Sequence, residues 1–398
     1  MKLLHPFLHT AVLTLLLALT HATPVQSADA PSLTDVKNPA DLAAKITATT
    51  DAATKLALKN HTAAILAAAA KKPHVDFVIA ALDKAPGTYT KTNTTPADLR
   101  QALGRDSEIF DTLTLVNLAS STLNIKAKRE TDPFDQAFYE HLGNITELQS
   151  LQILHTTAQN DWLAPLANLH ALTNISIVNQ SKLNDLGLAH LAGLKQLVRL
   201  AYVGTSTTGR PFTNFHGWTQ LKSSSFRGSQ IDDAGLQALC EAFPNYESLS
   251  LAHAKFTDAA ALHLGKLTKL KGLELGSTKA TSKSLQPLVN LPLEYFQLGE
   301  GVDAPAALSI IKDFKSLKRL TLTNCKDYTD ADLQIVAGLK TLEHVELGSL
   351  PITAERVSAL KIFAFLKSMR IIRGGTPYPP EILASIKAAL PNVALKFD

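Results

Sequence analysis

The amino-acid sequence predicts an α/β solenoid, with a parallel β-sheet on its concave face, helices on its convex face and a small α-helical domain before the repeats. Three observations predict this fold. A leucine-rich motif recurs ten times at intervals of 23–25 residues. Within the motif, apolar and polar residues alternate with the period of a strand, and after it a Thr or Asp precedes apolar residues at helical spacing. Neither half can bury its apolar side alone, so consecutive units have to stack.

The first residues have the pattern of a targeting segment. Lys2 supplies a positive start, and an apolar run over 11–19 is followed by small residues suited to cleavage. The alternative is a retained membrane anchor, which needs about 20 apolar residues. His21 interrupts the run too early for that. The sequence therefore predicts a signal peptide over 1–22, with cleavage as late as residue 30, and no transmembrane segment in the mature chain.

Residues 31–110 predict a small helical domain or cap. Two Asn or Thr cap residues are each followed by Pro and then by Asp in the first turn. The Ala-rich stretch 51–71 is expected to form a helix that Pro73 ends, with a further helix from 75 to 82. Such a domain would shield the open core edge that a solenoid has at its end.

Residues 111–147 predict one or two degenerate repeats. Short strands are expected near 113–115 and 123–125, and a helix over 134–142. The ten regular units then fill 148–390, and their first residues are Leu148, Leu172, Leu197, Leu221, Tyr246, Leu270, Leu293, Leu317, Leu342 and Leu366. A last helix over 379–386 and a C-terminal capping strand within 391–398 complete the prediction.

In the unit that begins at Leu270, Leu273 and Leu275 alternate with Glu274. The two leucines therefore point to the core, and the glutamate points to the opposite, open face.

The helical halves identify a family resemblance. The segment Ile231-Asp-Asp-Ala-Gly-Leu236 and the segments Leu186–Leu194 and Leu390–Val393 resemble the leucine-rich repeats of exported bacterial proteins. That resemblance implies a right-handed leucine-rich-repeat solenoid over about 148–398.

The ninth position of the unit departs from the family pattern. The family expects Asn or Cys there, whereas this chain has Thr156, Gln180, Thr205, Ser229, Ala254, Thr278, Gly301, Cys325, Leu350 and Gly374. A buried asparagine ladder is therefore absent. We expect Ser and Thr hydroxyls, or water, to satisfy the backbone of the turns instead.

The two cysteines and one irregular loop can be placed on the repeat. Cys240 and Cys325 lie four units apart, which at about 4.8 Å per strand is roughly 19 Å. A disulfide needs Cα atoms within about 7 Å, so both are expected to be buried free thiols. In the unit over 205–221, Phe212, Phe215 and Trp218 either form a protruding aromatic loop or pack inward. The usual burial of large aromatics favours inward packing.

Composition and motifs argue against several function classes. The 39 basic and 35 acidic residues form no basic stripe, and 6% aromatic residues leave little for base stacking, so nucleic acid is a poor partner. The sequence has no catalytic, metal-binding or phosphate-binding motif. We therefore expect no enzyme, no cofactor and no bound metal, but an exported, monomeric module that binds a protein or a glycan. The alternatives are a structural envelope protein without a discrete ligand and an enzyme with its site in 31–145.

The open strand face over about 270–375 is the expected binding surface. Its polar residues become more charged there than in the first half of the repeats, and Tyr and Arg are enriched at binding hot spots. Solvated strand faces are polar in any case, so the pattern alone does not require a ligand. The expected partner-binding residues are Glu274, Tyr295, Gln297, Arg319, Thr321, His344, Glu346 and Arg370.

Overall fold

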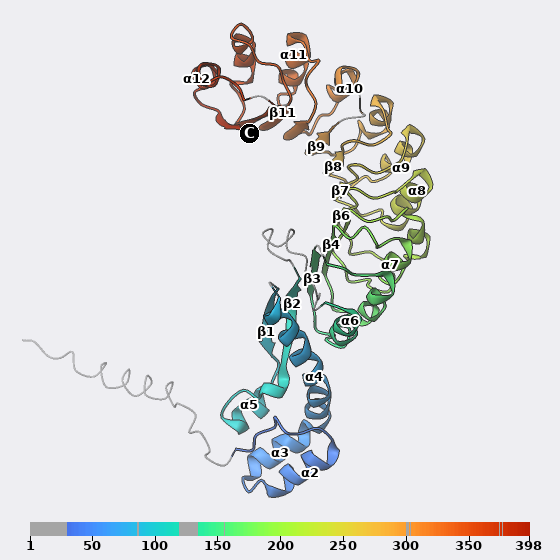
Figure 1. Cartoon of the computed structure of the whole chain (residues 1–398), viewed down its shortest axis with the longest axis vertical. Helices are drawn as coiled ribbons and strands as arrows, with labels where there is room; N and C mark the ends of the chain where they lie inside the picture. The colour runs from blue at the N-terminus through green and yellow to red at the C-terminus, as the bar shows by residue number, and fades with distance from the viewer. Residues whose placement is uncertain are drawn as a thin grey trace, which may run out of the picture. The chain divides into compact units, whose positions relative to one another are not determined.

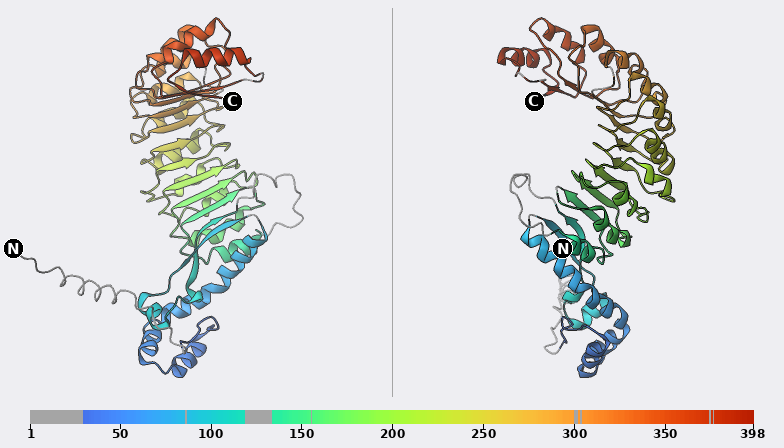
Figure 2. Two further views of the ribbon diagram at one scale, coloured as in Figure 1. Left: turned by 90° about the vertical axis from the view of Figure 1, so that its left-hand side faces the viewer. Right: turned by 45° about the vertical axis from the view of Figure 1, so that its right-hand side comes forward.

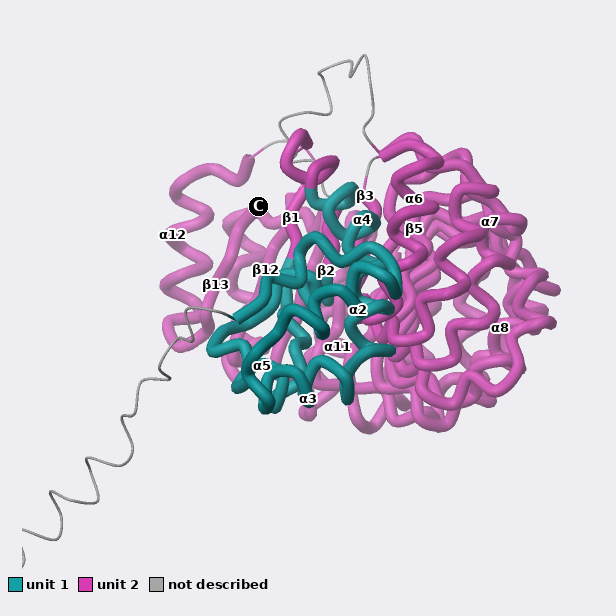
Figure 3. The backbone as a smooth tube through the Cα atoms, turned by 90° about the horizontal axis from the view of Figure 1, so that it is seen from below, with its two compact units in different colours: residues 1–79, 90–114 teal, residues 80–89, 115–398 magenta. Residues whose placement is uncertain are grey.

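The computed structural model describes residues 30–398 except 86, 119–133, 155, 300, 301, 303, 374 and 376. The expected signal peptide and the expected strand near 123–125 lie outside the described residues. The chain has two compact units, one of residues 1–79 and 90–114 and one of residues 80–89 and 115–398 (Figure 3). Within the described residues, no helix is long and apolar enough to cross a membrane.

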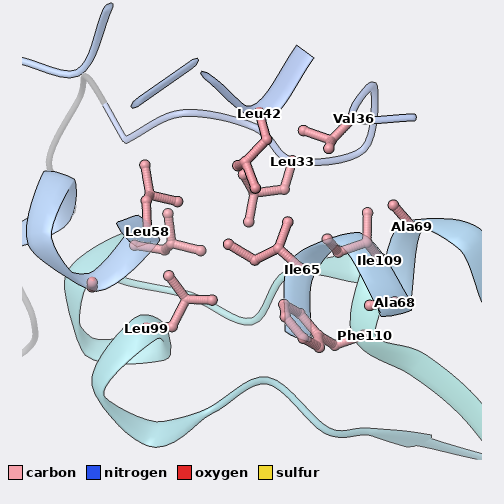
Figure 4. Close-up of a cluster of buried hydrophobic side chains, with 12 residues drawn as sticks. Leu33, Val36, Leu42, Leu58, Ile65, Ala68, Ala69, Leu99, Ile109 and Phe110 are labelled. Atoms are coloured by element: carbon pink, nitrogen blue, oxygen red, sulfur yellow. The ribbon is translucent and has the colours of Figure 1, made fainter. Parts of the chain in front are cut away.

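The first unit is mainly helical. Its elements are α2 (Pro39–Ala48), α3 (Ala52–Asn60), most of α4 (Thr62–Lys84), α5 (Ala97–Leu103) and the short 3-10 helix η1 (Glu108–Phe110), with parts of β1 (Thr88–Asn93) and β2 (Asp111–Asn117). Leu58, Ile65, Leu99 and Phe110 meet in its core (Figure 4). Asn38 caps α2, since its side chain accepts bonds from two amides of the first turn while Asp41 bonds back to the cap residue.

The prediction that Pro73 ends a helix is wrong. Helix α4 runs without interruption from Thr62 to Lys84 and contains Pro73. Proline removes one backbone hydrogen bond and crowds the preceding turn. Here Ile65 before it and Val75 and Val78 after it are all buried, so packing of the helix outweighs that cost. The expected single helix over 51–71 is also divided, because α3 ends at Asn60 and α4 begins at Thr62.

The second unit is a solenoid built on one sheet. The 13 strands of the sheet follow the order of the chain, and those from β2 onward pair in parallel. After β1 and β2, the strands of the described sheet are β3 (Ser150–Leu154), β4 (Asn174–Val178), β5 (Arg199–Val203), β6 (Ser223–Ser225), β7 (Ser248–Ser250), β8 (Gly272–Leu275), β9 (Tyr295–Leu298), β10 (Arg319–Leu322), β11 (His344–Gly348), β12 (Ser368–Ile372) and β13 (Ala394–Phe397). The sheet lines the inner side of an arc, and the helices cover the outer side (Figures 1 and 2). The predicted α/β solenoid fold is therefore confirmed.

The helical halves are shorter and more varied than the periodicity predicts. Several are 3-10 rather than α-helices. They are α6 (Gln136–Leu142), η3 (Asn160–Asn168), α7 (Asp185–Ala189), η4 (Arg210–Asn214), α8 (Asp233–Ala242), η5 (Asp258–Ala260), α9 (Ala261–Leu264), η6 (Ser282–Leu288), α10 (Ala304–Ile311), α11 (Asp330–Gly338), η7 (Arg356–Phe363) and α12 (Pro380–Ala389). The expected last helix and capping strand correspond to α12 and β13, and β13 pairs with β12.

The Thr-Asp motif bonds neighbouring units at two consecutive junctions of the repeat. Asp233 accepts bonds from the backbone N and the hydroxyl of Thr257 in the following unit, at 2.6 and 2.7 Å. Asp258 does the same for Thr281 at the same two distances. The threonine side chain in turn caps its own helix. The motif that predicts a helix start thus also fixes the stacking of neighbouring units.

The turns after the strands have a constraint at the eighth position. Six units place this residue in the left-handed region, with φ between 54° and 74°: Asn179, Gly204, Gly228, His253, Ser277 and Ser349. At the ninth position, the hydroxyls of Thr156, Ser229 and Thr278 accept from the amide two residues on. The expectation that hydroxyls satisfy these turns is confirmed at these units.

The irregular unit over 205–221 packs inward. Phe212, Phe215 and Trp218 are at most 2% exposed and stack around Phe243 of the next unit. The inward alternative is therefore confirmed. Cys240 and Cys325 are both buried and free, as their places in the repeat predict.

Candidate interaction surface

The concave face of the second unit presents two rows of side chains. The third position of the unit contributes Ser150, Asn174, Arg199, Ser223, Ser248, Gly272, Tyr295, Arg319, His344 and Ser368. The fifth position contributes Gln152, Ser176, Ala201, Ser225, Ser250, Glu274, Gln297, Thr321, Glu346 and Arg370. Residues of the intervening positions are buried in the core. All eight sequence-predicted residues therefore lie on one face of adjacent strands, β8 to β12.

Small side chains form the floor over β6 and β7. These strands read Ser223-Ser-Ser225 and Ser248-Leu-Ser250, and both flanking serines of each strand are on the open face. Gly272 continues the third-position row on β8. The side chains of this row become larger at β9, where Tyr295 is the first large side chain after Arg199.

Tyr295 lies between the part of the concave face with small side chains, on β6 and β7, and the part with charged side chains, from β10 onward. Its hydroxyl lies 2.8 Å from the side-chain oxygen of Gln297 and 3.2 Å from a carboxylate oxygen of Glu274, to which it donates. The other Glu274 oxygen accepts from the Ser250 hydroxyl at 2.6 Å. A Cβ at Gly272 would lie 3.6 Å from the tyrosine ring, so the ring lies close over that glycine.

Two carboxylates act on the Tyr295 hydroxyl. Partial burial, followed by the charges of Glu274 and Glu346, raises the pKa of the tyrosine above its ordinary value. The hydroxyl therefore stays protonated at neutral pH and remains a donor. Its hydrogen bonds to Glu274 on β8 and to Gln297 on β9 fix its position, so the ring has a defined orientation on the concave face.

A second network closes the C-terminal end of the surface. Arg370 bonds Glu346 at 3.1 Å through one guanidinium nitrogen, and its Nε donates to Asp398. Lys396 lies 3.7 Å from the same Asp398. The Arg370 guanidinium holds the pKa of the Asp398 carboxyl below its usual value. Asp398 and Lys396 were not among the sequence-predicted residues, although the register of β12 with β13 places Lys396 beside Arg370.

The remaining predicted residues differ in accessibility. His344 Nδ1 lies 2.7 Å from the Ser368 hydroxyl. Arg319 is exposed, and its guanidinium has no hydrogen bond or ion pair to any of the described residues. Thr321 is only 5% exposed, so it supports its neighbours and offers little surface to a partner.

A row of residues with alternating charge, here called the charge ladder, lies beside this surface. It is not among the sequence-predicted features. The second position of seven consecutive units alternates in sign: Lys222, Glu247, Lys271, Glu294, Lys318, Glu343 and Lys367. Ion pairs join Lys222 to Glu247 at 3.2 Å, Lys318 to Glu294 at 2.7 Å and Lys367 to Glu343 at 2.6 Å. Aligning the units as columns would have exposed this pattern. These three ion pairs join six of its seven charges, whereas Glu274 and Arg319 form no ion pair with the described residues.

The described residues offer no centre for metal chemistry. No group of three or more His, Cys, Asp or Glu residues among them is arranged to hold a metal ion. Burial raises the pKa of Cys240 and that of Cys325, the latter to about 12, which opposes thiolate chemistry. The arrangement of the concave face is suited to binding.

Comparison with known proteins finds similarity to other proteins with leucine-rich repeats. No protein-family model matches the chain. F-box/LRR-repeat protein 4 of Bos taurus is 28% identical over 247 residues, a match that covers 55% of this chain and 38% of that protein. An internalin (inlF) of Listeria monocytogenes str. 4b F2365 has a TM-score of 0.39 at 15% identity, covering 72% of this chain and 86% of its own. The matched part thus spans well under half the length of the curated relative.

The repeat of 23–25 residues and the parallel sheet define the fold as a leucine-rich-repeat solenoid, and the first of these similarities is to a protein with the same kind of repeat.

Proposed function

We propose that the chain is an exported, monomeric leucine-rich-repeat module that binds a partner through the concave face over β8 to β12. The observation that carries this proposal is the fixed cluster of Tyr295, Glu274, Ser250 and Gln297 on an exposed sheet face. Orienting polar side chains before binding reduces the entropy lost when a partner docks. A protein partner fits the charged end of this surface, and a glycan is the second candidate.

Export is the part of the proposal that rests on the sequence of residues 1–22. The domain limits at 31–110, 111–147, 148–390 and 391–398 also belong to the proposal. The N-terminal helical domain would cover one end of the repeats, as solenoids require.

The enzyme alternative finds little support in the first unit. An open pocket of about 480 Å³ there is lined by Asp51, Asp98 and Gln101, among others. Asp51 caps α3 through the amide of Thr54, and Asp98 is bonded to His61. Both carboxylates that line the pocket thus have hydrogen-bond partners within the first unit, and we favour the binding function of the concave face.

Affinity capture from an envelope fraction tests the proposal. Three forms of the full chain are compared: the wild type, the double variant Tyr295→Ala with Arg319→Ala, and a convex-side control, Gln237→Ala with Lys312→Ala. Urea midpoints confirm that each is folded. We expect the same proteins to be enriched by the wild type and the control, and lost by the concave double variant.

Enrichment that the concave double variant leaves unchanged would overturn the site. Failure of every form to enrich anything reproducibly would favour the structural envelope protein.

A further inference from the structure

Two charged groups on the concave face, one on each side of Tyr295, lack a countercharge among the described residues. Glu274 on β8 receives two hydroxyl donors, from Ser250 and Tyr295. Among the described residues, no lysine, arginine or histidine forms an ion pair with it. Elsewhere on the same face, Glu346 is paired with Arg370. Two neutral hydroxyls orient a carboxylate but leave its charge uncompensated.

The surroundings of Glu274 are those of a cation subsite. The Tyr295 ring lies beside the carboxylate over Gly272, and the serines of β7 leave the approach open. An aromatic ring next to a carboxylate attracts a cation by both its quadrupole and the neighbouring charge. A neutral sugar hydroxyl would leave that charge unmatched.

The other side of Tyr295 has the opposite sign. Arg319 is opposite Tyr295 in the register of β9 with β10, and its guanidinium is exposed and unpaired among the described residues. A guanidinium matches a carboxylate in a two-pronged geometry. The face thus presents a carboxylate held by hydrogen bonds and a guanidinium unpaired among the described residues, with one aromatic side chain between them.

We propose that Glu274 and Arg319 form a pair of subsites that recognise an extended segment of a partner protein, a basic side chain at Glu274 and an acidic side chain at Arg319. This inference rests on the proposed concave-face function and specifies its partner chemistry. Two strand steps of about 4.8 Å and a displacement of two residues, about 6.7 Å, separate the two Cα positions by about 12 Å. An extended peptide covers that distance in about four residues at about 3.3 Å each, and residues four apart have side chains on the same face of the peptide.

Fluorescence polarisation with designed peptides tests the pair. The probes are labelled dodecapeptides of Gly, Ser and Thr that carry one Lys and one Glu at separations from one to six residues, in both orders. The full-length chain is compared with Glu274→Gln, Arg319→Gln and the charge-matched control Glu381→Gln on α12. We expect the tightest binding at a separation of about four, with a loss of about tenfold in either site variant, which is about 1.4 kcal/mol, and no loss in the control.

A matched substitution makes the result specific. A peptide whose Lys is replaced by norleucine should bind the wild type and Glu274→Gln equally. A peptide with Glu at both charged positions should prefer Glu274→Lys over the wild type. Equal affinities for all separations, or no measurable binding of any peptide, would overturn the inference.

The position of the bound peptide separates this inference from the function on which it rests. A benzophenone on the peptide reports its position after irradiation and mass spectrometry. Crosslinks to β6–β11 with an affinity that ignores Glu274 would refute the charge pairing and leave the concave-face function standing. Crosslinks confined to the helices of the convex side would refute both.

Discussion

Gly235 is where stacking of the repeats leaves no room for a side chain, and its replacement by alanine gives a direct test of the fold. The glycine lies in the first turns of α8, in the Asp-Ala-Gly-Leu part of the motif. A Cβ there would lie 2.9 Å from the carbonyl carbon of Thr208 and 3.2 Å from the Cα of Gly209, and it would overlap the Thr208 carbonyl oxygen. All these atoms are backbone of the preceding unit, so no side-chain rotation can relieve the overlap.

The expected cost follows from two opposing effects. Overpacking against rigid backbone costs about 3 kcal/mol, the upper end of the usual range. Alanine in place of glycine inside a helix returns about 1 kcal/mol. The net destabilisation of Gly235→Ala is therefore about 2 kcal/mol.

Urea unfolding followed by far-ultraviolet circular dichroism measures it, with hydrogen exchange to show where protection is lost. Gly338→Ala is the matched control, since Gly338 ends α11 and a Cβ there meets nothing within 4 Å. We expect the control to be as stable as the wild type or slightly more so. A Gly235→Ala midpoint no lower than that of the wild type would refute the backbone-to-backbone stacking.

Three further predictions concern the bonds between units and the buried thiols. Asp233→Ala should lower the free energy of unfolding by about 2 kcal/mol, because it removes two charge-assisted bonds to Thr257; an unchanged urea midpoint would contradict this. Burial raises the pKa of both cysteine thiols, so a disulfide reagent at about pH 8 should label them only after unfolding, and fast labelling of the native chain would disprove their burial. Lys318 lowers the pKa of Glu294, so their pairing stabilises above the unfolded pKa of the glutamate and is lost as pH falls through the lower folded value. Lys318→Gln should therefore lose less stability than the wild type between about pH 7 and about pH 3, and an equal loss would count against the ladder.

The periodicity was sufficient to predict the repeated strands and the inward side of each. Leu273 and Leu275 are buried on either side of Glu274, as the alternation requires. It could not predict which helical halves would be 3-10, because that depends on how much room the neighbouring unit leaves. The continuation of α4 through Pro73 likewise depends on burial on both sides of the proline, which local propensity does not contain.

For the surface, the sequence was sufficient to place all eight expected residues on one face but not to describe how they pair. Register follows from the repeat, so Tyr295, Arg319 and His344 fall in one row. The burial of Thr321 and the bond of Arg370 to Asp398 depend on side-chain orientation. The left-handed residue at the eighth position was missed because Asn, Gly, His and Ser share no single sequence signature there.

Site-specific photo-crosslinking tests the concave-face claim most directly. A benzoylphenylalanine is placed at Ser248 on β7, which is exposed on the concave face, or at Lys312, which follows α10 on the convex side, and cells that express the chain are irradiated. A discrete adduct from position 248, absent from position 312 and weakened by Glu274→Gln, is the predicted result. Adducts from position 312 alone, or from neither position, would contradict a binding function for the concave face.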